Sequence, residues 1–150
     1  MIYLYQFILS FFASAGFGIL FNAPRAAIIR CGLTGAVGWM VFYILREGGV
    51  DLVLASYISA LVLSAVALLN SRSQKMPVIL YITCGIIPLV PGGMAYDSMR
   101  QIVLQEYMMA LEYGFEAALI SLAIATGIIS TEMSDQVLQT IRKKLKKKEV

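Results

Sequence analysis

Long uncharged runs of hydrophobic residues alternate with short charged segments along this chain. A helix needs roughly 20 apolar residues to cross about 30 Å of hydrocarbon, and flanking Lys or Arg side chains can extend a shorter run by snorkelling. We therefore expect an all-α polytopic membrane helix bundle with five transmembrane helices. The five runs are Ile2 to Phe21, Cys31 to Leu45, Leu52 to Ser71, Met76 to Tyr96 and Ala117 to Thr131.

The fourth run carries a deliberate interruption. Pro88 and Pro91 have no N–H, so the carbonyls of Cys84 and Ile87 lose their helical donors, and Gly92-Gly93 follows directly. Within a bilayer, non-helical backbone survives only where protein buries it or a watery cavity borders it. The pattern predicts a fourth helix broken at Pro88 to Gly93, and such breaks in membrane transporters often mark a binding site.

Composition agrees with a membrane location, because 59% of the 150 residues are hydrophobic and only 14% are charged. The basic residues fall ten to two on alternate connecting segments, which by the positive-inside rule predicts N-out, C-in. We expect a transmembrane domain over residues 1–134 and a basic cytoplasmic tail over 135–150. The tail follows an amphipathic pattern that suits anionic lipid headgroups, and it lacks the interleaved aromatic residues of a nucleic-acid site.

Chemistry-bearing residues are sparse. The chain has no histidine, and its two cysteines, Cys31 and Cys84, both fall within predicted spans. These residues suggest neither a disulfide framework nor a zinc site, and they offer no pairing of nucleophile and base. We therefore expect no enzyme activity, no cofactor and no metal.

Small residues recur at helix-packing spacing in three spans and predict close helix contacts, either within the chain or with a second one. These residues are Gly32, Gly35 and Gly38; Ser56, Ala60 and Ser64; and Ala117, Ser121 and Ala125. Downstream of the break, an apolar helical spacing from Met99 runs without interruption into the fifth span. The opposite side of this helix is polar. It either lines an aqueous entrance or meets a partner chain, or it faces water while the helix lies at the exterior membrane interface. It comprises Asp97, Gln101, Gln105, Glu112 and Glu116.

Four segments resemble the small, carboxy-terminal-type half of the threonine/serine exporter family. They are Ala13–Arg25, Gly32–Trp39, Lys75–Pro77 and Gly85–Tyr96, of which the proline-glycine break followed by Tyr96 is the most specific. The resemblance implies a multi-pass protein of the bacterial inner membrane, half of a split exporter driven by the proton gradient. Its partner would be a five-span subunit of opposite orientation, which would give an inverted repeat. A homo-oligomer is the alternative assembly.

The predicted chemistry of the break fits a small carboxylate-bearing cargo. If a helix restarts after Gly93, its free N–H groups and positive dipole end can bind a carboxylate, while the freed carbonyls can accept from an ammonium. Threonine and serine are the expected cargo; a succinate or dicarboxylate exporter half and a non-transporting structural or regulatory subunit are the alternatives. The candidate substrate-binding residues are Pro88, Pro91, Gly92, Gly93, Tyr96 and Asp97, with Asp97 equally interpretable as an interfacial residue.

Overall fold

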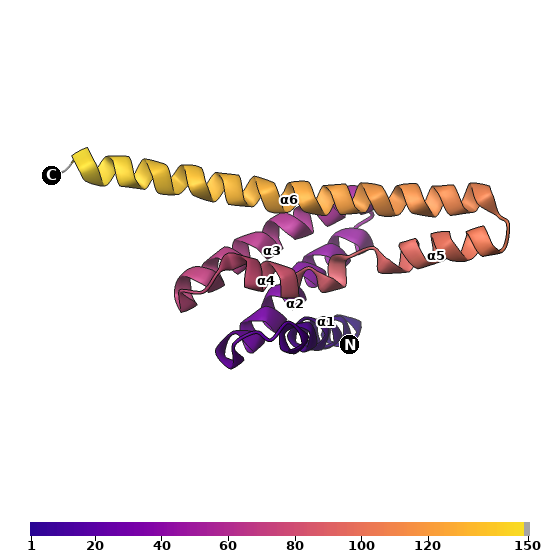
Figure 1. Cartoon of the computed structure of the whole chain (residues 1–150), viewed down its shortest axis with the longest axis horizontal. Coiled ribbons are helices and arrows are strands. Elements are labelled where there is room, and N and C mark those ends of the chain that lie inside the picture. Colours follow the sequence, from indigo (N-terminus) through magenta and orange to yellow (C-terminus); the bar gives the residue numbers. More distant parts are fainter. Residues whose placement is uncertain (149–150) are drawn as a thin grey trace.

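The computed structural model describes residues 1–148, with side chains described through Ile141. Helices account for the ordered structure, and residues 1–148 contain no strand. Figure 1 shows the arrangement, in which a long C-terminal helix lies across a bundle of shorter ones. In chain order the helices are α1 (Ile2–Leu20), α2 (Arg25–Glu47), α3 (Leu52–Gln74), α4 (Val78–Gly85), the 3₁₀ turn η1 (Ile87–Leu89), α5 (Gly92–Val103) and α6 (Tyr107–Lys148).

The prediction of an all-α bundle of membrane-spanning helices with a break in its fourth segment is confirmed. Helices α1, α2, α3 and α6 are each long and apolar enough to cross a membrane. A fifth candidate is the pair of segments Val78–Leu89 and Gly92–Val103, which bend by 50° at the break and form either a broken span or a re-entrant loop. The chain is therefore an α-helical membrane protein that crosses the bilayer several times.

Helices α2, α3 and α6 extend beyond the uncharged runs that predicted them, whereas α1 ends at Leu20, one residue before its run does. Pro24 precedes α2 and Pro77 precedes α4, where the missing N–H costs no intrahelical bond. Asp51 caps α3, since its Oδ2 accepts from the amides of Val53 and Leu54 at 3.0 and 3.4 Å. Helix α6 has 42 residues and continues through the predicted boundary between residues 134 and 135. The basic side chains of 142–148 lie outside the described side chains, so the cytoplasmic tail stays a prediction.

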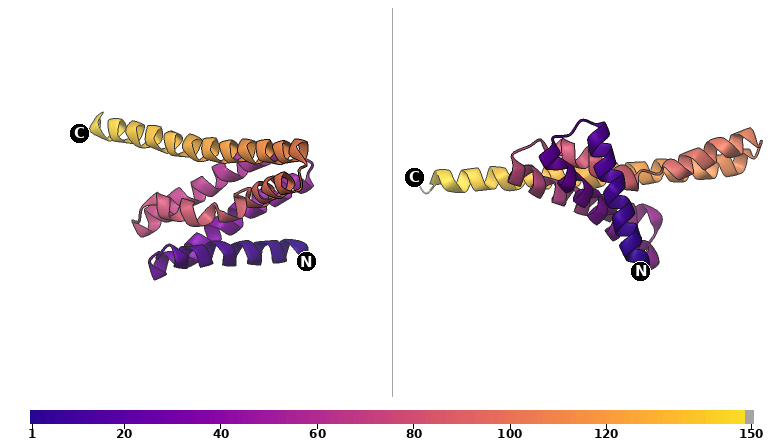
Figure 2. Two further views of the ribbon diagram at one scale, coloured as in Figure 1. Left: turned by 45° about the vertical axis from the view of Figure 1, so that its right-hand side comes forward. Right: turned by 90° about the horizontal axis from the view of Figure 1, so that it is seen from below.

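The helices run alternately in opposite directions, with α4 and α5 continuing in one general direction across the break, so the other connections alternate between two sides of the molecule (Figure 2, left). The α1–α2 and α3–α4 connections lie on the same side as the C-terminus. The N-terminus lies on the opposite side with the α2–α3 and α5–α6 connections. This alternation matches the predicted parity of five crossings. Which side faces the cytoplasm still rests on the distribution of Lys and Arg.

Glycines allow close contact between neighbouring helices. A Cβ on Gly32 would lie 2.7 Å from the Phe11 ring of α1, and one on Gly38 would lie 2.8 Å from Leu63 of α3. The predicted contact faces of α2 and α3 are buried within this chain, and so is Ala117 of α6. Ser121 and Ala125 are exposed, so their contact with a second chain stays a prediction. Gly127 makes the close contact with α3 instead, since its Cβ would lie 2.8 Å from the Tyr57 carbonyl oxygen.

Helix α5 and the first turns of α6 form a hairpin that projects from the rest of the bundle (Figure 1). The predicted uninterrupted helix from Met99 into the fifth span is wrong. Helix α5 ends at Val103, Gln105 adopts a left-handed φ of 65°, and α6 begins at Tyr107. The polar and apolar stripes therefore lie on two antiparallel helices instead of one.

Candidate functional site

The break in the fourth span is a short stretch of irregular backbone between α4 and α5. Helix α4 ends at Gly85, η1 follows, and Val90 is extended with φ −64° and ψ 129°. Pro91 then adopts φ −77° and ψ 49°, and the Gly92 amide donates to the Val90 carbonyl at 2.8 Å. These values describe an inverse γ-turn over three residues, and the two segments on either side of it bend by 50°. The predicted break is thus present, but it starts earlier than Pro88, directly after Gly85, and α5 begins at Gly92 instead of after Gly93.

The amino end of α5 presents unpaired donors at the break. The first regular helical bond runs from the Ala95 amide to the Pro91 carbonyl at 3.1 Å. No side chain caps this helix, and the amides of Gly93 and Met94 have no hydrogen-bond partner among the described residues. Free N–H groups and the positive end of the helix dipole together favour an anion. The arrangement predicted for carboxylate binding is therefore available to a ligand.

The break is open on the side of its glycines. Gly92 and Gly93 are exposed, and a Cβ added to either would meet no atom within 4 Å. On the other side lies a small, mainly apolar cavity of about 220 Å³ between the break and α6. Its lining residues are Ile86, Val90, Pro91, Ser121, Ile124, Ala125 and Ile128. A small solute at the break would thus have protein against one side and nothing from this chain against the other.

The predicted site residues divide into two groups. Pro88 and Pro91 are half-buried, and Pro91 lines the cavity beside the open pair Gly92-Gly93. Tyr96 and Asp97 lie one turn into α5, which has no buried residue; Tyr96 is 69% exposed and Asp97 is half-buried. Their part in substrate binding stays a prediction.

The freed carbonyls also differ in access. Cys84 is fully buried, so its carbonyl presents no surface to a solute, whereas Ile87 is half-buried. Sequence reasoning missed Ser121, the polar residue that α6 contributes to the cavity. Its hydroxyl donates to the Ala117 carbonyl at 2.8 Å. The small residues Ala117, Ser121 and Ala125 could have indicated this position, because Ser121 and Ala125 line the cavity beside the break.

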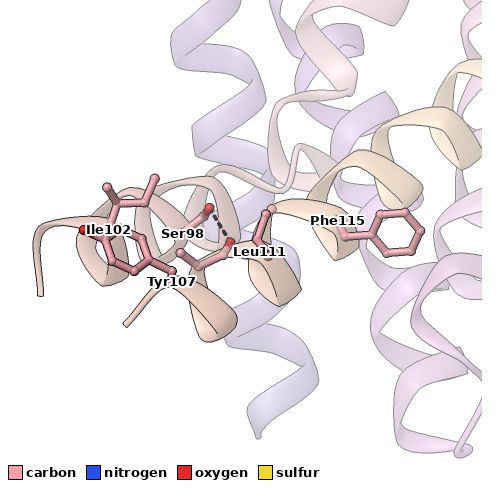
Figure 3. A pocket seen from close by; sticks show the side chains of 7 residues that line it. Ser98, Ile102, Tyr107, Leu111 and Phe115 are labelled. Carbon is pink, nitrogen blue, oxygen red and sulfur yellow. Dashed lines mark hydrogen bonds between the residues drawn. The ribbon is translucent and has the colours of Figure 1, made fainter. Parts of the chain in front are cut away.

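A second hollow lies between α5 and α6 in the projecting hairpin (Figure 3). Its volume is about 480 Å³ and its walls are almost entirely apolar, including Ile102, Leu111 and Phe115. The hairpin is held together where the Ser98 hydroxyl donates to the Ala110 carbonyl at 2.7 Å. A Cβ on Gly114 would lie 3.1 Å from the same hydroxyl, so glycine allows this close approach. The hollow offers few polar groups with which to bind a charged solute.

Within the described residues, no three histidine, cysteine or acidic side chains gather closely enough to hold a metal ion. Cys31 and Cys84 are free and buried.

Comparison with known proteins gives one family. The family model described as Threonine/Serine exporter, ThrE matches residues 6–133, which is most of the chain. No solved structure matches.

Proposed function

Because the chain belongs to the threonine/serine exporter family, we propose that it is a membrane subunit of a secondary transporter that exports threonine and serine. The site would be the break in the fourth span. The observation that carries the proposal is the pair of unpaired amides, Gly93 and Met94, at the amino end of α5 beside an open cavity. A carboxylate is the group that such a helix end binds best, and both amino acids carry one.

We further propose that the working transporter contains a second membrane subunit of opposite orientation, in the inner membrane of a bacterium. The open side of the break supports this proposal. A Cβ added to Gly92 or Gly93 would meet no atom of this chain within 4 Å, so a partner subunit can approach the glycines there. The exposed hairpin supports it too, because α5 buries none of its residues. Two such halves would form an inverted repeat with the cargo at their interface.

Radiolabelled efflux tests the proposal. Cells that express the chain with and without a five-span partner of opposite orientation are loaded with threonine, serine or succinate. We expect threonine and serine efflux only when both chains are present. Efflux of succinate alone would instead identify a dicarboxylate exporter half. Full efflux by this chain alone would identify a homo-oligomer, and no efflux of any of the three would leave a structural or regulatory subunit.

A further inference from the structure

An apolar groove lies beside the first turns of α4, where the α1–α2 and α3–α4 connections meet. Its volume is about 470 Å³ and its walls are almost entirely apolar. Phe21 and Pro24 line it from the α1–α2 connection, and Ile79, Leu80 and Thr83 line it from α4. The Thr83 hydroxyl donates to the Ile79 carbonyl at 2.7 Å, so its proton is used within the helix. The lining residues of α4 span nearly two turns, or about 10 Å along the helix.

The two connections that border the groove are joined by one side chain. Gln74, the last residue of α3, donates through Nε2 to the Ala26 carbonyl at the start of α2, at 2.8 Å. Its Oε1 accepts from the hydroxyl of Tyr81, a fully buried residue of α4. Gln74 therefore links α2, α3 and α4, which keeps the two sides of the groove together without a ligand.

The end of the groove at the connections is basic. Arg25 and Lys75 each adjoin a residue that lines the groove, and both are exposed. Neither has an ion-pair partner among the described side chains. No Asp or Glu occurs in residues 1–46 or 52–96. No described side chain caps the amino ends of α2 and α4, and the dipoles of these helices add to the same positive potential.

The hollow in the α5–α6 hairpin is equally apolar but lacks this charge pattern. Three acidic residues, Asp97, Glu106 and Glu112, each adjoin a residue that lines the hairpin hollow, and one basic residue, Arg100, lies on α5 beside them. The two hollows are similar in size, so their charges distinguish them. The groove beside α4 favours a ligand that is both apolar and anionic.

We propose that this groove, with Arg25 and Lys75 at its end, binds an anionic phospholipid of the cytoplasmic leaflet. One acyl chain would lie along α4 and the phosphate would meet the two basic side chains. Basic pockets between transmembrane helices on the cytoplasmic side bind such headgroups in other membrane proteins. Both connections lie on the side of the C-terminus (Figure 2, left), which the distribution of Lys and Arg assigns to the cytoplasm. The inference goes beyond the proposed function and does not depend on the cargo.

The direct test is lipid binding by the purified protein without threonine. Thermal stability is measured in detergent as phosphatidylglycerol or phosphatidylcholine with the same acyl chains is titrated into the micelles. We expect phosphatidylglycerol to act at the lower concentration. The double variant Arg25→Gln/Lys75→Asn should raise its half-effective concentration roughly tenfold or more, since each basic residue near an anionic lipid contributes about fivefold. Asparagine suits the left-handed φ of 54° at position 75.

Arg46→Gln/Arg100→Gln is the matched control, because it removes the same charge from the opposite side of the molecule. This variant should respond to phosphatidylglycerol as the wild type does. All variants keep the basic tail, so any lipid contacts of the tail are the same in each. Equal effects of the two lipids on the wild type would overturn the inference, as would equal responses of the two double variants.

Thr83→Phe tests the acyl chain and serves if the charge variant does not fold. Phenylalanine should fill the groove and weaken the response to phosphatidylglycerol several-fold, although both basic residues remain. Thr126→Phe makes the same change on α6, where threonine also donates to a carbonyl of its own helix, and should have no such effect. Glycerol phosphate, which has no acyl chain, should stabilise the protein little. Stabilisation by glycerol phosphate as strong as that by the lipid would overturn the lipid site and leave a site for a soluble anion.

Discussion

Glycines serve opposite purposes in two regions of this molecule. At the crossing of α1, α2 and α4, Gly35 leaves no space, since a Cβ there would lie 1.8 Å from Ser14 Oγ. At the break, Gly92 and Gly93 border open space, with no atom within 4 Å of an added Cβ. The first region uses glycine to bring helices together. The second exposes backbone that no neighbour within the chain covers.

The difference separates a glycine that allows the helices to pack from glycines that leave backbone accessible to other molecules. Lipid is as apolar as the helices, so close backbone approach stabilises the bundle, and a side chain at Gly35 works against it directly. At the break, the structure tolerates additional atoms, and a substitution there acts on whatever approaches from outside the chain. Variants in the two regions should therefore differ in kind: loss of folded protein in one, and loss of export with folded protein in the other.

The largest effect is expected from Gly35→Val. Two branched methyl groups cannot fit where Ser14 already occupies the Cβ position, so α1 must move away from α2 at a cost of about 3 kcal/mol or more. The amount of monodisperse protein recovered in detergent should fall sharply. Normal recovery and an unchanged melting temperature would show that the crossing is looser than the structure indicates.

Pro91→Ala should come next, with an effect on export alone. Alanine restores an N–H that can donate to the Ile87 carbonyl and removes the restriction on the dihedral angles of Val90, so the break should straighten. We expect threonine efflux to fall roughly tenfold or more while membrane insertion is unchanged. Quantitative blotting of membrane fractions provides the control. Undiminished efflux from the alanine variant would argue strongly against the break as the cargo site.

A smaller effect is expected from Gly93→Leu, with Gly93→Ala as its matched control. Both side chains have room within this chain, so both proteins should fold, and alanine is favoured over glycine in a helix by about 0.5–1 kcal/mol. Leucine should obstruct the approach of a carboxylate to the α5 amides and raise the half-saturating threonine concentration several-fold. Equal transport by both variants would show that the cargo does not approach this face.

The smallest effect is expected from Glu116→Gln. Glu116 is half-buried on α6 near the base of the hairpin. If its side of the hairpin is simply wet, export should change less than about twofold, since exposed charges contribute little. A large loss of efflux would instead assign this polar stripe to an aqueous entrance or a partner contact. Efflux at matched protein amounts distinguishes the two interpretations that the sequence leaves open.

Local covalent chemistry explains why the break was predictable from the sequence. Proline lacks an N–H in any environment, so Pro88 and Pro91 determine where the fourth span must depart from a helix. Hydrophobic run length similarly identified the other four spans. Helix ends were less accurate, because the prediction stopped at charged residues such as Arg46, whereas α2 continues to Glu47.

Features that depend on tertiary packing could not be read from the sequence. The turn between α5 and α6 contains neither glycine nor proline, yet Gln105 is left-handed there, and the Ser98 hydroxyl joins the two helices by donating to the Ala110 carbonyl. The exposure of Ser121 and Ala125 likewise follows from how α6 is rotated against α3. The close contact of Ser14 with Gly35 likewise joins residues of α1 and α2 that no sequence spacing relates.

The length of α6 has a mechanical consequence. A continuous helix of 42 residues is a rod about 60 Å long, twice the depth of the hydrocarbon layer. Ser121 and Ile124 adjoin the break near its middle, and Asp135 pairs with Arg72 of α3 further along. A tilt of about 6° around the middle would displace each end by about 3 Å. A small movement of the break against Ser121 and Ile124 would in this way displace both ends of α6, toward the two faces of the membrane, at the same time.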